Sequence, residues 1–336
     1  MCLQLNQMYL YRLYNSKNGL KMKAVQFAQH GGPEVLQVQE VPDPIPGPTD
    51  VLIQVKATTV NRLDLFQRDG SRPVPKLPYT PGWEAAGVVL RDNQGFHAGE
   101  RVMTTRAVGA VGGGGYASMI AAPAADLVRI PEGVSFELAV AAGLTASTAW
   151  GSLFDLGHLK VGERVLIWAG SSGVGTLAIQ FAKQAGCWVA TTTSNNAKAA
   201  ELRRLGADRV INQREENVAE VLQSAQGVHL VIELVSTTLQ TSIDACAQDG
   251  RIVLIGNLGG QLATIDTQLC RLKRVQIIGG GQLRTSLKNE QHILEMIAAK
   301  TVTPAIARTL PIEEAAQAHR LLATGQMLGK IVLVHS

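Results

Sequence analysis

The second half of the chain alternates short apolar runs with stretches of helical composition. From Glu163 onward the apolar runs are RVLIWAG, CWVATTT, DRVIN, HLVIELV, RIVLIGN and VQIIGGG, and GTLAIQFAKQAG and NNAKAAELRRLGA separate the first three. Strands that alternate with helices of about 10–15 residues predict βαβ units in a parallel sheet. Short continuous apolar strands are typical of a sheet covered on both faces. This half therefore predicts an α/β domain with a Rossmann-type, doubly wound parallel sheet.

The first half, from Met22 to about Ala142, has the pattern of strands and loops. VLIQVKATTV (Val51–Val60), EAAGVVL (Glu84–Leu90) and ERVMTT (Glu100–Thr105) are strand candidates. Prolines crowd between Pro42 and Pro81 and mark turns. A compact β-rich domain is expected here.

Four further stretches complete the predicted organisation. FELAVAAGLTASTAWGSLF has helical composition, NEQHILEMIAAKTVTP and IEEAAQAHRLLATGQ predict two late helices, and KIVLV predicts a final strand. The predicted domains are a β-rich catalytic domain over 22–145 and 285–336 and a dinucleotide-binding domain over 146–284. The extension over 1–21 is expected to be disordered. It lacks the apolar core and small-residue cleavage site of a signal peptide.

Composition narrows the class of protein. The chain has 336 residues, 46% hydrophobic and 17% charged, which suits about two domains with a large core. A net charge of +4 with no densely basic stretch argues against nucleic-acid binding. The sequence contains no run of about 20 apolar residues, so no membrane-spanning helix is predicted. We expect a protein that acts on a small molecule, with no nucleic-acid or membrane partner.

The four cysteines, Cys2, Cys187, Cys246 and Cys270, are dispersed and form no Cys-x-x-Cys pair. Isolated cysteines suit a reducing compartment, so a cytoplasmic location is expected. The seven histidines are equally scattered and give no metal-ligand spacing.

The strongest local motif is the glycine loop in VLIWAGSSGVGTLAIQFAKQAG. Gly170, Gly173 and Gly175 follow a predicted strand and open a predicted helix. That context is the one a dinucleotide fingerprint requires, with the helix N-terminus facing the phosphates. A tight strand–helix turn without a ligand is the alternative. The further βαβ-type elements downstream favour dinucleotide binding.

The end of the second strand bears on the choice of dinucleotide. An NAD site places Asp or Glu there to hold the ribose 2′-hydroxyl, but the segment Ser194–Lys198 reads SNNAK. Hydroxyl, amide and lysine groups suit a 2′-phosphate, so NADPH is favoured over NADH. An ordinary solvated lysine is the alternative for Lys198.

Two other features of the sequence bear on the mechanism and on the ligand pocket. All five tyrosines lie upstream of the glycine loop, which excludes the Tyr-x-x-x-Lys mechanism of short-chain dehydrogenases. The run Val111–Gly115 (VGGGG) is either a mobile loop or a loop that lines a ligand pocket.

The order of these motifs resembles a known superfamily. A β-rich domain is followed by AAGLTASTAW, AGSSGVG, GADRVINQREE and IGNLGG. This order is similar to the medium-chain dehydrogenase/reductases. The segment Gly32–Gly70 (GPEVLQVQ…LFQRDG) most resembles their zinc-independent quinone oxidoreductase branch, the zeta-crystallin type. The resemblance runs from Met22 to the C-terminus. It implies a GroES-like catalytic domain beside the Rossmann-type domain, with NADPH in the cleft between them.

The resemblance also bears on metal binding. Zinc alcohol dehydrogenases have a cysteine at the position of Asn61 and a Gly-His-Glu motif where this chain has Gly82-Trp83-Glu84. Without Cys or His at these positions a zinc site lacks suitable ligands, so no metal is expected. Trp83 is expected to pack in the domain core.

The resemblance implies a set of site residues. Asn61 and Asp64 would face the nicotinamide and are the expected catalytic residues. Asn61 would polarise the acceptor oxygen. The alternative is that Asn61 is a structural turn residue that holds the cofactor ribose. The other expected cofactor contacts are Thr145 near the nicotinamide, Gly170, Ser172, Gly173 and Val174 at the pyrophosphate, Ser194, Lys198 and Gln213 at the adenosine 2′-phosphate, and Gly256 and Asn257 closing over the cofactor.

The substrate pocket is expected to include Phe66 and Tyr116. The branch often has tyrosine where this chain has Phe66 and Gln213. The first departure removes a pocket hydroxyl and the second weakens the case for a 2′-phosphate. Phe66 is equally compatible with core packing.

The expected reaction is hydride transfer from NADPH to a quinone or α,β-unsaturated carbonyl, with the proton taken from water. One alternative is a zinc-independent enoyl-thioester reductase or alcohol dehydrogenase. The other is an NADPH-binding regulatory protein with little catalysis. A homodimer is expected, because the apolar run Arg274–Gly281 would be an edge strand open to a second copy.

Overall fold

The computed structural model describes residues 21–106, 108, 114–281, 283 and 285–335. Residues 1–20 of the predicted extension and Val111–Gly113 of the glycine run lie outside the described residues. The chain forms two compact units. Unit 1 comprises Met1–Leu144, Arg308–Gln326 and Ile331–Ser336, and unit 2 comprises Thr145–Ala307 and Met327–Lys330.

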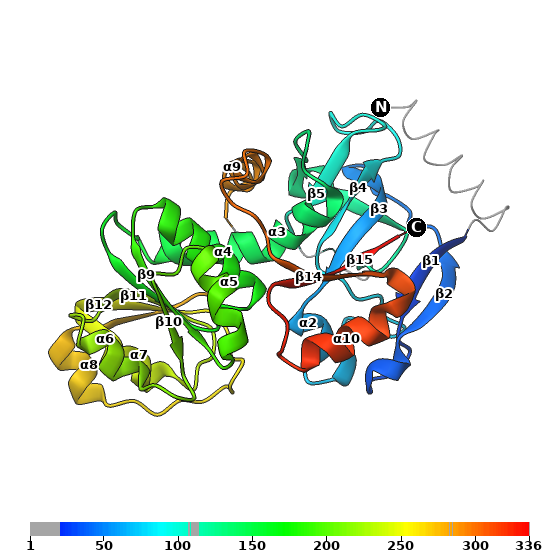
Figure 1. Cartoon of the computed structure of the whole chain (residues 1–336). Coiled ribbons are helices and arrows are strands. Elements are labelled where there is room, and N and C mark those ends of the chain that lie inside the picture. Colours follow the sequence, from blue (N-terminus) through cyan, green and yellow to red (C-terminus); the bar gives the residue numbers. More distant parts are fainter. Residues whose placement is uncertain (1–20, 107, 109–113, 282, 284, 336) are drawn as a thin grey trace. The chain divides into compact units, whose positions relative to one another are not determined.

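Unit 2 contains a six-stranded parallel sheet in the order β10-β9-β8-β11-β12-β13 (Figure 1). Numbered from β8, this is the 3-2-1-4-5-6 order of the Rossmann fold. The Rossmann-type sheet predicted from the sequence is confirmed. The strands are β8 (Arg164–Ile167), β9 (Trp188–Thr193), β10 (Arg209–Asn212), β11 (Val228–Glu233), β12 (Cys246–Leu254) and β13 (Gln276–Gly279).

Helices connect the strands of unit 2, and Figure 1 shows α4 and α5 in green beside β9 and β10. Several begin at a residue whose side chain accepts from the first turn, such as Ser172 before α4 and Asp266 before α8. The helices are α4 (Gly173–Gln184), α5 (Ala199–Arg204), α6 (Val218–Gln223), α7 (Leu239–Ala245), α8 (Thr267–Lys273) and α9 (Leu287–Ala298). Leu166, Val231 and Ile252 form part of a fully buried core between helices and sheet.

Unit 1 is built on a seven-stranded sheet in the order β14-β15-β3-β4-β5-β7, with β6 also paired to β3, and its strands are antiparallel from β15 to β7. Its inner face is closed by alternate apolar residues such as Val51, Ile53 and Val55. The predicted β-rich domain is confirmed. The strands are β3 (Asp50–Val60), β4 (Ala85–Val89), β5 (Arg101–Thr104), β6 (Met119–Pro123), β7 (Leu127–Arg129), β14 (Ile306–Pro311) and β15 (Lys330–Val334), with the hairpin β1 (Lys21–Gln26) and β2 (Gln37–Pro42) beside them.

In the described part of unit 1 the α-helices are α2 (Arg62–Asp69), α10 (Ala315–Ala323) and the first half of α3 (Phe136–Trp150). Helix α3 is interrupted at Gly143, whose φ of 7° and ψ of −122° are not helical. The chain passes into unit 2 one residue later, after Leu144. No helix in the described ranges is long and apolar enough to cross a membrane.

The predicted domain boundary near residue 285 differs from the one observed, because residues 285–307 group with unit 2. Gln180 of α4 explains the difference. Its Nε2 donates to the Thr303 carbonyl at 3.0 Å, and its Oε1 accepts from the Thr303 N–H at 2.8 Å. A buried amide that satisfies both backbone groups of one residue fixes that segment against α4.

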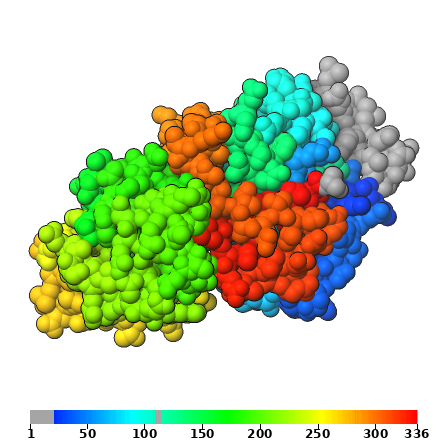
Figure 2. Space-filling view, in the orientation of Figure 1, coloured from blue at the N-terminus to red at the C-terminus, as the bar shows by residue number. Residues whose placement is uncertain are grey.

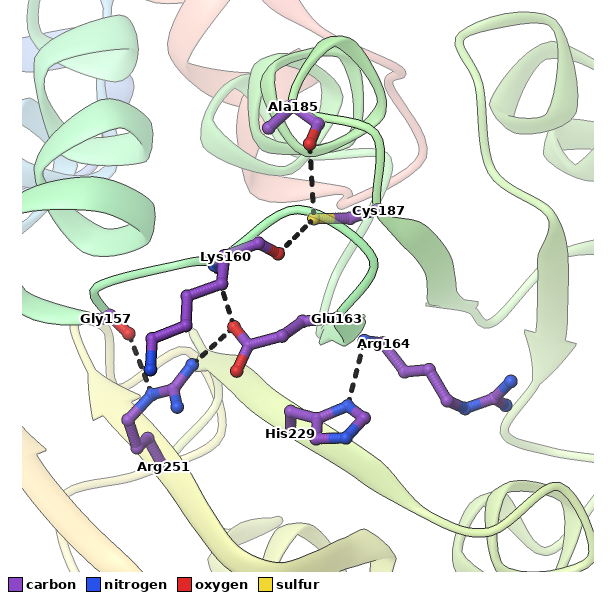
Figure 3. Close-up of polar contacts among 8 residues, drawn as sticks. All are labelled: Gly157, Lys160, Glu163, Arg164, Ala185, Cys187, His229 and Arg251. Atoms are coloured by element: carbon purple, nitrogen blue, oxygen red, sulfur yellow. Dashed lines mark hydrogen bonds and ion pairs between the residues drawn. The ribbon is translucent and has the colours of Figure 1, made fainter.

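The amino ends of the unit 2 strands are joined by a polar cluster (Figure 3). Arg251 donates to Oε2 of Glu163 at 2.6 Å and to the Gly157 carbonyl at 2.8 Å. Glu163 also accepts from the Lys160 N–H at 2.9 Å, and the Cys187 thiol donates to the Lys160 carbonyl at 3.3 Å. These partners belong to the strand starts and their preceding turns, so this edge has a structural role. The opposite edge carries the residues predicted to bind cofactor.

Candidate functional site

Glycines that leave no room for a side chain close the turn after β8. A Cβ on Gly170 would lie 2.0 Å from Oγ1 of Thr191, and one on Gly175 would lie 2.5 Å from the Ala169 carbonyl oxygen. The Gly170 N–H donates to the Thr192 carbonyl at 3.1 Å. These contacts are the tight turn and the close helix–strand packing that a dinucleotide loop requires.

Helix α4 begins directly after this turn, at Gly173. Ser172 is its N-cap, and the Ser172 Oγ accepts from the Gly175 N–H at 3.0 Å. A Cβ on Gly173 would come within 3.0 Å of Cγ2 of Thr145, so this predicted cofactor residue lies at the same helix end. Val174 is half-buried. The first turn of a helix carries N–H groups without intrahelical partners and partial positive charge, which favour an anion.

Lys198 lies beside the glycine loop rather than in solvent. Its side chain is 8% exposed, and its Nζ donates to Oγ of Ser171 at 3.4 Å and to the Met327 carbonyl at 3.2 Å. Burial lowers the pKa of its ammonium. Ser194, at the end of β9, is half-buried. The segment after β9 thus brings one buried cation to the loop, and no carboxylate occurs in Ser194–Lys198.

The remaining predicted cofactor residues follow two other strands at the same edge of the sheet. The Gln213 N–H donates to the Thr193 carbonyl at 3.0 Å, and its side chain is exposed. Gly256 follows β12, where a Cβ would meet the Leu234 carbonyl at 2.5 Å. Asn257 is exposed. The carboxyl ends of parallel strands share one edge, and in doubly wound folds that edge is where ligands bind.

Glu233, which the sequence did not single out, organises this edge. It is fully buried at the end of β11. Its Oε1 accepts from the Val235 and Ser236 N–H groups at 2.9 and 3.1 Å, and its Oε2 accepts from Oγ of Ser242 at 2.6 Å. Ser236 in turn donates to the Gly256 carbonyl at 2.6 Å. Glu233 therefore holds the loop against which Gly256 packs.

Asn61 and Asp64 form a reciprocal cap at the start of α2 in unit 1. The Asn61 N–H donates to Oδ2 of Asp64 at 2.7 Å, and the Gly82 N–H donates to its Oδ1 at 3.0 Å. Asp64 is 0% exposed. Two backbone N–H groups of unit 1 thus contact the Asp64 carboxylate, and its position facing the nicotinamide stays a prediction.

The side chain of Asn61 is held by a second acidic residue. Its Nδ2 donates to Oε2 of Glu84 at 2.7 Å, and the Thr59 hydroxyl donates to Oε1 of Glu84 at 2.8 Å. Glu84 is 2% exposed and packs against Gly143, where a Cβ would lie 3.2 Å from its Cγ. The amide nitrogen of Asn61 thus faces Glu84. A role in polarising the acceptor oxygen stays a prediction that this rotamer does not favour.

The two predicted pocket residues differ in exposure. Phe66 is half-buried, as a pocket wall would be. Tyr116 is 0% exposed, and its hydroxyl lies 3.2 Å from Nε2 of His319. The other ring nitrogen of His319, Nδ1, lies 3.4 Å from Nη1 of Arg68. Burial, together with Arg68, lowers the pKa of His319 to about 3, so the imidazole is neutral at pH 7. Tyr116 therefore belongs to a buried polar chain.

Two family models match the chain. The alcohol dehydrogenase GroES-like domain matches residues 47–132, and the zinc-binding dehydrogenase domain matches residues 173–299. The quinone oxidoreductase of Lama guanicoe is 32% identical over 329 residues, which cover 93% of this chain and 97% of the relative. The chain belongs to the quinone oxidoreductase branch of the medium-chain dehydrogenase/reductases. The protein is therefore an oxidoreductase, as predicted.

Solved structures of medium-chain dehydrogenase/reductases share the fold. The crystal structure of an NAD-dependent alcohol dehydrogenase is 30% identical, with a TM-score of 0.89, and the match covers 94% of this chain and 100% of that one. The Escherichia coli quinone oxidoreductase complexed with NADPH is 28% identical, with a TM-score of 0.83 and coverage of 93% and 99%. The predicted pairing of a GroES-like and a Rossmann-type domain is confirmed.

Within this superfamily, the two positions compared with zinc ligands are engaged as hydrogen-bond donors. Asn61 donates to Glu84, and the Trp83 indole donates to Oε1 of Gln67 at 3.1 Å. Trp83 is half-buried, with Arg72 5.7 Å from its ring, so it does not lie in the core as expected. In the described part of the chain, no three His, Cys, Asp or Glu side chains are grouped to hold a metal.

Proposed function

We propose that the protein is an NADPH-dependent reductase that transfers a hydride to a quinone or an α,β-unsaturated carbonyl without zinc. The observation that carries the proposal is the position of Lys198, buried beside the glycine loop at the N-terminus of α4, in a segment without a carboxylate. A 2′-phosphate matches this cation. NADPH, when bound, supplies the hydride.

The residues of unit 2 fit a phosphorylated dinucleotide. Gly170 and Gly175 allow the close turn, α4 presents its N-terminus, and Lys198 adds positive charge. The protein's contribution is to hold donor and acceptor together, and orientation of this kind is worth on the order of 7–11 kcal/mol. Support also comes from the likeness to a quinone oxidoreductase complexed with NADPH.

The proton that follows the hydride is proposed to come from water. The hydroxyl of Tyr116 and the ring of His319 are both 0% exposed and contact each other. Burial first, then Asp64 and Glu84, raise the pKa of Tyr116 well above its ordinary value. These groups are therefore poorly placed to donate a proton to a bound substrate.

The proposed independence from zinc rests on donor chemistry. An amide N–H and an indole N–H have no lone pair to offer, whereas Zn²⁺ binds thiolate sulfur, imidazole nitrogen or carboxylate oxygen. Asn61 and Trp83 present those N–H groups at the two compared positions.

The decisive experiment uses chelator-treated protein. NADPH and NADH are titrated by fluorescence, and NADPH oxidation is followed with 9,10-phenanthrenequinone, an aliphatic enone, an enoyl thioester and, in reverse, a secondary alcohol with NADP⁺. Turnover with the quinone or enone supports the proposal. Turnover limited to the thioester or alcohol indicates the alternative enzymes. Tight NADPH binding with no turnover in the whole panel indicates a regulatory protein.

We also propose that the protein is a homodimer that pairs through β13. This strand is the edge of the unit 2 sheet, and Ile277 on it is 37% exposed. Helix α8 belongs to the yellow part of Figure 2, and its Leu272 is 56% exposed. An apolar edge strand favours pairing with a second copy. Light scattering at micromolar concentration tests this proposal, and a monomer would refute it.

A further inference from the structure

The indole of Trp83 is held in one orientation by buried partners. Its N–H donates to Oε1 of Gln67 at 3.1 Å, and Nε2 of Gln67 donates to the Tyr79 hydroxyl at 3.1 Å. Gln67 and Tyr79 are 4% and 1% exposed, whereas Trp83 keeps part of its surface open. Unit 1 therefore presents a fixed aromatic ring directly before Glu84, the residue that binds Asn61.

The guanidinium of Arg72 lies over this ring, with its central carbon 5.7 Å from the ring centroid. The Arg72 N–H donates to the Phe66 carbonyl at 2.9 Å, which anchors the backbone from which the side chain extends. Phe66, the predicted pocket residue, is half-buried, as are Arg72 and Trp83. One cation and two aromatic rings thus come together on unit 1 with some surface still accessible.

Among the described residues, no acidic side chain forms a salt bridge with Arg72. Every Asp and Glu of the chain belongs to those residues. The indole that Arg72 covers is neutral, so it attracts the guanidinium without cancelling its charge. A half-buried guanidinium of this kind is stabilised when a carboxylate arrives beside it.

We propose that the preferred acceptor is a planar aromatic quinone or enone that carries a carboxylate, with Arg72 binding the carboxylate and Trp83 contacting the aromatic body. This inference rests on the proposed function and narrows its substrate class. A guanidinium binds a carboxylate through two parallel N–H groups, and its planar fork loses little freedom in doing so. A neutral acceptor gains nothing from this charge, so Arg72 selects between acceptors of the same shape.

The anion assigned to Arg72 is not a phosphate of the cofactor. Arg72 and Trp83 belong to unit 1, whereas the glycine loop and Lys198 belong to unit 2. Neither Arg72 nor Trp83 is among the expected cofactor contacts. Loss of the Arg72 charge is therefore expected to weaken anionic acceptors and to leave the affinity for NADPH unchanged.

Four variants and a matched pair of ligands test the inference by direct binding. Arg72→Gln removes the charge, Arg72→Lys keeps the charge but not the planar fork, and Trp83→Leu removes the ring. Arg320→Gln, at an exposed position of α10, is the control. Calorimetry gives the dissociation constants of 2-naphthoate and 2-naphthamide, which share one aromatic body and differ in charge. The NADPH constant and the melting temperature are measured for each variant.

Wild type is expected to bind 2-naphthoate about tenfold more tightly than 2-naphthamide, which corresponds to about 1.4 kcal/mol. Arg72→Gln should remove this preference, and Arg72→Lys should restore part of it, because an ammonium keeps the charge. Trp83→Leu should weaken both ligands by a similar factor. Arg320→Gln should bind both ligands as wild type does.

Turnover gives a second readout. For 9,10-phenanthrenequinone-2-carboxylate, Arg72→Gln should lower kcat/KM about tenfold through a higher KM, with kcat nearly unchanged. For the neutral 9,10-phenanthrenequinone, kcat/KM should stay within about twofold of wild type, because no charge is recognised. This split between the two quinones is one that a merely structural role of Arg72 would not produce.

Four outcomes overturn the inference. They are a wild type that binds 2-naphthoate no more tightly than 2-naphthamide, an Arg72→Gln variant that loses the charged and neutral compounds equally, a loss of NADPH affinity in Arg72→Gln, and a Trp83→Leu variant that binds both naphthalenes as wild type does. A different result marks failure of the proposed function. In that case wild type reduces neither quinone, while the preference for 2-naphthoate can still be measured.

Discussion

Asn61, which stands where zinc alcohol dehydrogenases have a cysteine, donates a 2.7 Å hydrogen bond from its Nδ2 to Oε2 of Glu84. Glu84 also accepts from Thr59 and is 2% exposed. The acidic side chain therefore joins the end of β3 to the start of α2 through hydrogen bonds. Its removal leaves buried donors without an acceptor, which is the costly case for a hydrogen bond.

Glu84→Gln is expected to lower the free energy of unfolding by roughly 1–3 kcal/mol, because the amide must turn an NH₂ group toward one of two existing donors. Urea denaturation measures the change. Glu132→Gln, at an exposed position of unit 1, is the control and should leave the midpoint unaltered. Equal stability of the two variants would show that Glu84 does not brace Asn61.

A carboxylate placed at the end of β9 is expected to change the preferred dinucleotide. Ser194→Asp supplies the acid that holds a ribose 2′-hydroxyl and repels a 2′-phosphate. The NADPH dissociation constant should rise at least about tenfold, and the NADH constant should stay the same or fall. Ser194→Asn has the same size without the charge and is the control. An unchanged ratio of the two constants would place the 2′-phosphate elsewhere.

Gly170→Ala is expected to disrupt the glycine loop. Its Cβ would lie 2.0 Å from Oγ1 of Thr191, so the turn must open, at a cost of roughly 1–3 kcal/mol. NADPH affinity and the melting temperature should both fall. Gly281→Ala, where a Cβ meets no atom within 4 Å, is the control. Wild-type binding by Gly170→Ala would contradict a phosphate site on this turn.

Glu290 is expected to make stability fall as the pH rises. It is 2% exposed on α9, and burial raises its pKa to about 8 from an ordinary value of 4.5. The folded state therefore holds this proton more tightly than the unfolded state. The contribution of Glu290 to the free energy of unfolding is fully present below pH 4.5 and is lost as the pH rises through 8. Between pH 4.5 and 7 the loss is roughly 3 kcal/mol.

Glu290→Gln removes this proton linkage. Unfolding in urea at pH 5, 7 and 9 should show a smaller fall in stability for Glu290→Gln than for wild type. Glu295→Gln, at an exposed position of the same helix, should follow the wild-type curve. Parallel curves for all three proteins would mean that Glu290 titrates near its ordinary pKa.

The parallel sheet could be predicted because each strand is a short apolar run and the first two crossovers have helical composition. The glycine loop, Lys198 and Gly256 follow strand ends, so topology alone brings them to one edge. The role of Asp64 could not be decided from the sequence, for a physical reason. A short acidic side chain three residues after an N-cap can serve the helix start or a ligand, and the sequence does not separate these uses.

Glu84, Glu233 and Arg72 were missed for different reasons. Glu84 lies in the Gly82-Trp83-Glu84 motif, but its partners Thr59 and Asn61 stand more than 20 positions earlier in the chain. Glu233 ends the apolar strand β11, and an acidic residue directly after such a run could have indicated a carboxylate that binds the following loop. Arg72 lies in a proline-rich loop, and nothing local indicates that its guanidinium lies over Trp83.

The brief passage of Met327–Lys330 into unit 2 means that neither unit is a continuous length of chain. A fragment that stops at Ala307 keeps all six strands of the parallel sheet and omits one wall of the glycine loop. A chimaera with a relative that changes parent between Ala307 and Met327 would combine the glycine loop of one parent with the Met327–Lys330 segment of the other. Grafting the nucleotide-binding unit intact therefore calls for transplanting this tetrapeptide together with the larger block.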